Sequence, residues 1–162
     1  MFRTLILTAL LALPVAAQED MDLGSPPAGT YRPDPAHTRL WFIVDHLGFS
    51  KYMALFTKVD ATLQFDPEHP EAMSVTAAVD LRSLETHNPA TDYNFNEIVS
   101  GEDLLNAPAH PEATFVSTKV ELTGEETANV TGNMTLNGVT KPVVWKASYN
   151  GGWGHMPLDP MG

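Results

Sequence analysis

The sequence predicts an all-β fold built on an antiparallel sheet, with one short helical segment. Runs of β-branched and aromatic residues recur along the chain, and turn-forming residues separate them. This spacing favours antiparallel strands over alternating strand–helix units. The pair Asn137-Gly138, between two apolar runs, is the favoured pair for a two-residue hairpin turn. The 162 residues suffice for one domain with its own core.

The amino terminus has the layout of a secretory signal. A basic residue, Arg3, precedes an apolar run from Leu5 to Leu13, and small residues lead to a cleavage site after Ala17. The apolar run is too short to span a bilayer, so we expect export without stable membrane insertion. Residues 18–30 are acidic and then rich in Gly, Ser and Pro, which is typical of a flexible leader.

The strands are expected in six segments of β-type composition. They are Leu40–Phe49, Val59–Phe65, Met73–Leu81, Thr114–Leu122, Ala128–Leu136 and Val139–Tyr149. The first segment is apolar on both alternating faces, which predicts a core or cavity on one side and a helix or the leader on the other. Between the third and fourth segments, residues 89–108 suggest a short helix or two turns, with Thr91 or Ser100 as N-cap.

The turn at Asn137-Gly138 also predicts the register of its hairpin. Leu136 then faces Val139, Gly132 faces Val143 and Val130 faces Trp145, which makes one face apolar. On the other face, Thr135 pairs with Thr140 and Asn129 with Lys146. The exception on the apolar face is Lys141, opposite Met134, whose long stem can reach water. The question is what this apolar face covers.

Composition excludes several classes of partner and chemistry. The chain has 20 acidic and 9 basic residues, which argues against nucleic acid or anionic lipid headgroups as partners. It has no cysteine, so it can form neither disulfides nor thiolate–zinc sites. Neither a nucleophile elbow nor a phosphate-binding glycine loop is present, so we do not expect an enzyme. A metal site using Asp34, His37 and His46 stays open as an alternative.

Several blocks of the sequence together resemble the YceI-like domain. They are "YRPDPAHTRLWFIVDHLGFSKYMALF", "LRSLETHNPATD", "HPEATFVSTKVEL" and "VTGNMTLNGVTKPVVW". The resemblance implies a lipocalin-like extended antiparallel β-barrel over residues 31–162, exported to the periplasm. It further implies a polyisoprenoid lipid, of quinone or prenyl-pyrophosphate type, bound in an apolar tunnel with no other cofactor. The family continues past "DPMG" with further strands, so this chain is expected to lack the last of them.

The resemblance also implies which residues line the tunnel. They are Phe42, Val44, His46, Phe56, Leu63, Phe65, Phe115, Met134, Leu136, Val143 and Trp145. His46 either binds the ligand headgroup or is a core histidine with a protein partner. The alternatives to lipid binding are an interaction module for a membrane redox protein, a homodimer, and the small metalloprotein described above.

Overall fold

The computed structural model describes residues 26–152. The expected signal peptide (1–17), most of the leader and the last ten residues lie outside this range. Gly29 and Thr30, expected at the end of the leader, belong instead to a strand that pairs with residues 63–65. Along the described chain, no helix is long and apolar enough to cross a bilayer.

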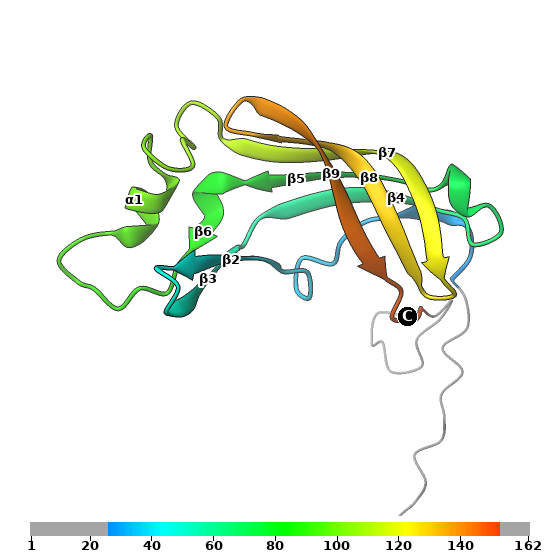
Figure 1. Ribbon diagram of the computed structural model, residues 1–162, viewed down its shortest axis with the longest axis horizontal. Coiled ribbons are helices and arrows are strands. Elements are labelled where there is room, and N and C mark those ends of the chain that lie inside the picture. Colours follow the sequence, from blue (N-terminus) through cyan, green and yellow to red (C-terminus); the bar gives the residue numbers. More distant parts are fainter. Residues whose placement is uncertain (1–25, 153–162) are drawn as a thin grey trace, which may run out of the picture.

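Two antiparallel sheets make up the fold (Figure 1). The strands are β1 (Gly29–Tyr31), β2 (Leu40–His46), β3 (Ser50–Phe56), β4 (Val59–Phe65), β5 (Ser74–Asp80), β6 (Leu84–Glu85), β7 (Glu112–Gly124), β8 (Thr127–Leu136) and β9 (Val139–Ser148). Six strands form an arched sheet in the order β1-β4-β5-β7-β8-β9. The hairpin β2–β3 with β6 forms a small second sheet beneath one end of the arch.

The predicted hairpin register is confirmed. Leu136 pairs with Val139, Gly132 with Val143 and Val130 with Trp145. Asn137 and Gly138 have φ angles of 50° and 71°, as a two-residue turn of this type requires. On the other face, the hydroxyls of Thr135 and Thr140 lie 2.8 Å apart.

The first predicted strand, Leu40–Phe49, runs past the end of β2 into the turn that follows it. β2 ends at His46, and Leu47 and Gly48, both with positive φ, reverse the chain into β3. Its two faces are not both buried: Phe42 packs on Phe56 with ring centroids 5.6 Å apart, but Trp41 and Ile43 are 52% and 60% exposed. The expected cover of the second face is therefore wrong for the described chain.

The helical segment was placed correctly, but its predicted start was not. The helix α1 (Phe95–Ser100) begins after Asn94, whose side chain accepts a hydrogen bond from the backbone N–H of Glu97 at 3.3 Å. Asn94 rather than Thr91 is the N-cap because it directly precedes the first helical turn and Glu97 follows three residues later. Ser100, the other predicted cap, is the last helical residue.

A closed barrel is not found among residues 26–152. The six-stranded sheet has β1 at one edge and β9 at the other, and these strands do not pair with each other. The architecture is therefore mostly antiparallel β, and residues 26–152 form an open arch, so the expected barrel is not confirmed. Buried residues gather between the arch and the small sheet. They are Ala54, Phe56, Val79, Leu81, Leu84, Ala107 and Ala113.

Phe115 shapes the middle of the arch. Its side chain is 2% exposed and reaches across β8 from β7, so that its ring stacks on Trp145 of β9 with centroids 3.7 Å apart. Gly132 lies beneath this ring. A Cβ at that position would be 2.4 Å from Phe115 Cζ and 2.5 Å from the carbonyl oxygen of Val116. Glycine is required here because the aromatic ring occupies the space of a side chain.

We expect Gly132→Ala to lower the free energy of unfolding by about 1–3 kcal/mol, because the added methyl overpacks the ring. Urea unfolding checks this value. Combining Gly132→Ala with Phe115→Leu should cost less than the sum of the two single changes, since the smaller side chain vacates the contested space. Strictly additive costs would contradict the packing described.

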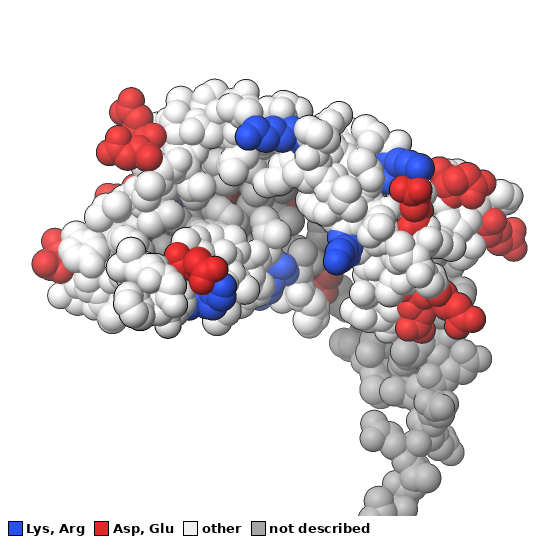
Figure 2. Space-filling model, in the orientation of Figure 1, with Lys and Arg blue, Asp and Glu red and all other residues white. Residues whose placement is uncertain are grey.

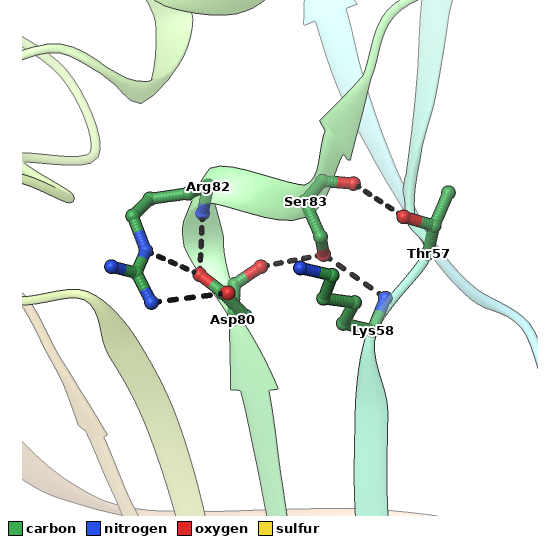
Figure 3. A network of polar contacts seen from close by, with 5 residues as sticks. All are labelled: Thr57, Lys58, Asp80, Arg82 and Ser83. Carbon is green, nitrogen blue, oxygen red and sulfur yellow. Dashed lines mark hydrogen bonds and ion pairs between the residues drawn. The ribbon is translucent and has the colours of Figure 1, made fainter.

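A polar network joins the two sheets where the chain crosses between them (Figure 3). The Ser83 hydroxyl donates to the carbonyl oxygen of Asp80 at 2.6 Å and accepts from the backbone N–H of Lys58 at 3.0 Å. The Ser83 carbonyl accepts from the N–H and hydroxyl of Thr57. The Asp80 carboxylate accepts three hydrogen bonds from Arg82, at 2.8 to 3.1 Å. This network holds the β3–β4 and β5–β6 connections together.

The hydrogen bonds from the Arg82 side chain are the largest cause that lowers the pKa of Asp80 below the ordinary value of an aspartate. Because the folded-state pKa is depressed, this carboxylate stabilises the fold above its unfolded-state pKa, and the contribution is lost as pH falls through the folded value. We therefore expect Asp80→Asn to destabilise the protein at neutral pH, and the difference from the wild type to shrink as the pH falls below the unfolded-state pKa of the aspartate. Urea unfolding at neutral pH and at successively lower pH measures the difference.

The control is Asp60→Asn, because Asp60 forms only an exposed ion pair with Arg32 at 3.6 Å. Its effect on stability should be much smaller at neutral pH. An Asp80→Asn penalty that persists unchanged in acid would show that charge at this site does not matter.

Candidate functional site

The candidate site is the concave face of the arched sheet. Strand pairing places on this face a set of residues that is almost wholly apolar. Figure 2 shows the hollow beneath the arch, with mostly uncharged surface and with acidic side chains toward the ends of the molecule. Two cavities lie along this face.

The first, which we call the hairpin cavity, has a volume of about 320 Å³ and lies between the β2–β3 hairpin and the arch. It is lined by Leu40, Trp41, Phe42, Phe56, Val79, Leu81, Leu105, Ala113, Met134 and Leu136. Every lining residue is apolar. Such a cavity can hold hydrocarbon, and the indole N–H of Trp41 is the one strong hydrogen-bonding group among its lining side chains.

The second, which we call the distal cavity, has a volume of about 270 Å³ and lies at the opposite end of β8. Its apolar wall includes Leu63, Phe65, Val75, Val120, Leu122, Ala128, Val130, Ala147 and Tyr149. The rings of Phe65 and Tyr149 stack with centroids 6.2 Å apart. Glu125 and Glu126, from the β7–β8 turn, also line this cavity and give its mouth a negative charge.

The stacked rings of Phe115 and Trp145 lie between the two cavities. Phe115 pairs with Met134, which lines the hairpin cavity, and Trp145 pairs with Val130, which lines the distal one. The concave face is therefore apolar from one cavity to the other. An extended hydrocarbon chain is the ligand shape that matches such a face.

The predicted lining residues fall into four places. Phe42, Phe56, Met134 and Leu136 line the hairpin cavity, and Leu63 and Phe65 line the distal cavity. Phe115 and Trp145 form the stack between them, with Val143 on the same face of β9. Val44 and His46 lie toward the hairpin tip and are exposed. The exposed position of His46 differs from the interior position that both of its predicted roles required.

Sequence reasoning missed much of the distal cavity. Ala128 and Ala147 pair directly with each other across β8 and β9, and their small side chains leave space there. A β-bulge between Ser117 and Lys119 shifts the register of β7 by one residue, so that Val120 and Leu122 also face this cavity. The paired alanines were visible in the predicted hairpin register, but nothing in the sequence marked the bulge.

The alternative metal site does not assemble. Nδ1 of His37 lies 2.5 Å from a carboxylate oxygen of Asp34, and this hydrogen bond is the largest cause that lowers the pKa of Asp34. His46, the third expected ligand, is not part of this pair. Between residues 26 and 152, no three His, Asp or Glu side chains gather in a way that could hold a metal ion.

Two serine side chains near the site form hydrogen bonds with backbone groups. The Ser117 hydroxyl accepts from the N–H of Val75 at 2.8 Å, and Ser83 belongs to the network that joins the sheets. Both hydroxyl groups therefore have structural roles.

These features define a class of protein: an antiparallel β fold whose concave, mostly apolar face carries two cavities. The YceI-like domain family matches residues 31–159. The chain therefore belongs to the YceI-like family, as its sequence blocks suggested.

Relatives and solved structures agree with this assignment. The chain is 40% identical over 115 residues to a UPF0312 protein of Pseudomonas savastanoi pv. phaseolicola, covering 71% of this chain and 58% of that protein. It is 34% identical over 147 residues to a Vibrio cholerae relative, covering 90% and 71%. Among solved structures, BcnA of Burkholderia cenocepacia matches with a TM-score of 0.63 and 27% identity, over 70% of this chain and 68% of BcnA. The YceI protein of Campylobacter jejuni matches with a TM-score of 0.58 and 29% identity, over 75% and 68%.

Proposed function

We propose that this protein binds and carries a polyisoprenoid lipid, of quinone or prenyl-pyrophosphate type, without catalysing a reaction. The observation that carries this proposal is the apolar concave face with a cavity at each end. The signal-like amino terminus supports export, and we place the protein in the periplasm. Family membership supports a binding fold.

The energetics favour a ligand recognised by area. Burying a few hundred square ångströms of hydrocarbon at about 25 cal/mol/Å² contributes several kcal/mol. The loss of translational and rotational freedom on association offsets part of this gain. A ligand with a long, extended apolar chain is therefore favoured over a compact one of equal polarity.

The direct test is organic extraction of the protein purified from its native compartment, followed by mass spectrometry. We expect one dominant isoprenoid lipid near one equivalent. An empty extract from folded protein would reject lipid carriage.

A second candidate function is an interaction module for a protein partner, such as a membrane redox protein or a second copy of this chain. It is favoured by Leu47 and Phe49, which are 78% and 91% exposed at the tip of the β2–β3 hairpin. Apolar side chains this exposed often mark contact surfaces. A lipid-free protein that co-purifies with a stoichiometric protein partner would select this function.

Filling the distal cavity should abolish lipid binding. We expect Ala128→Trp to weaken binding of an isoprenoid lipid about tenfold or more, because a large ring occupies space that the chain would use. Quenching of intrinsic fluorescence by a short-chain quinone measures the affinity.

The matched control is Asn133→Trp, which places the same ring on the exposed outer face of the same strand. This variant should bind as the wild type does. Equal affinities for both variants would mean that the distal cavity does not hold the ligand.

A further inference from the structure

One charged side chain stands on the concave face of the six-stranded sheet. Alternation along the paired strands places Lys141 on this face, directly opposite Met134 and two residues from Val143. Every other residue that the described strands direct to this face is apolar, glycine, Ser117 or Tyr31. A lone lysine on such a surface requires an explanation.

The ammonium group of Lys141 is available to a ligand. The side chain is exposed, and the lysine and arginine ion pairs within residues 26–152 use Arg32, Lys51, Arg82 and Lys119 instead. Its neighbour across the hairpin, Met134, lines the hairpin cavity. Lys141 therefore places an unpaired positive charge beside a cavity that has no charged lining of its own.

The opposite end of the face carries the opposite charge. Glu125 and Glu126 line the distal cavity, next to Thr127 at the start of β8. Thr127 and Met134 are seven residues apart on one strand, which corresponds to roughly 23 Å at about 3.3 Å per residue. A ligand lying along β8 thus meets a cation at one end and two carboxylates at the other.

We propose that Lys141 anchors the phosphate or diphosphate headgroup of the bound lipid, with the isoprenoid chain running toward the acidic end. This inference rests on the proposed lipid-binding function and selects among its ligands. An ammonium group forms charge-assisted hydrogen bonds with phosphate oxygens. The net charge of −11 disfavours anionic ligands elsewhere on the protein, so a local cation determines where such a headgroup binds.

The test compares a polyprenyl phosphate with the polyprenol of the same chain length. We expect Lys141→Met to weaken binding of the phosphate about tenfold and to change binding of the alcohol by less than about twofold. Lys141→Arg should retain the preference for the phosphate. Lys141→Gln is a second variant if the methionine variant does not fold.

The control variant is Lys146→Met, which removes the same charge from the convex face of the same strand, opposite Asn129. It should change neither affinity by more than about twofold at moderate salt, where remote charges are screened. Isothermal titration calorimetry with detergent-dispersed lipid gives the affinity of each variant for each of the two lipids.

The possible results separate this inference from the proposed function. If the wild type binds both lipids but neither Lys141→Met nor Lys141→Gln reduces the phosphate preference, the anchor is wrong and lipid binding stands. Equal losses from Lys141→Met and Lys146→Met would show a general charge effect, which also overturns the anchor. Inorganic diphosphate that binds at Lys141 without lipid binding would identify a free-anion site and overturn both proposals. A wild type that binds neither lipid rejects both as well.

Discussion

The structure depends on one constraint: a six-stranded sheet with an almost wholly apolar concave face must keep that face from water. The β2–β3 hairpin covers one end, where Phe42 and Phe56 complete the core. In the middle, the stacked rings of Phe115 and Trp145 cover the face. This stacking is possible because Gly132, beneath the Phe115 ring, has no side chain. Toward the other end, the described strands leave hydrocarbon-sized space. The proposed binding site is thus the part of the concave face that the protein does not fill itself.

The β2–β3 hairpin is tied to the arch by hydrogen bonds outside the site. Ser83 and Asp80 link the two points where the chain passes between the sheets, through hydrogen bonds to residues 57 and 58. These four residues do not line either cavity. Thr57 and Asp80 are, however, next in sequence to Phe56, Val79 and Leu81, which line the hairpin cavity. A polar connection therefore adjoins the apolar site.

Local signals in the sequence predicted local structure well. Asn137-Gly138 determined a ten-residue register, because this turn tolerates few alternatives. The strand β3 was missed because the β2–β3 turn was not recognised. Leu47 occupies a positive-φ position of this turn, where a glycine or asparagine would have marked it, and the turn therefore reads as part of an apolar run. The barrel is not confirmed for the described chain, since closure depends on pairing between sheet edges that are far apart in sequence, here β1 and β9. The wall residues contributed by β7 were missed in part because its bulge has no sequence signature.

That bulge makes the length of β7 as important as its composition. Past Ser117, the extra residue turns Lys119 and Glu121 to the outer face, where they form an ion pair at 2.7 Å, and turns Val120 and Leu122 inward. Removing a single residue here would exchange the two sets and present charged groups to the distal cavity. Surface loops of this protein can change length during evolution with little cost. A change of one residue in β7, by contrast, would reverse which of its side chains face the cavity. Related chains that keep the same cavity must therefore conserve the number of residues in this part of β7, even where the residues themselves differ.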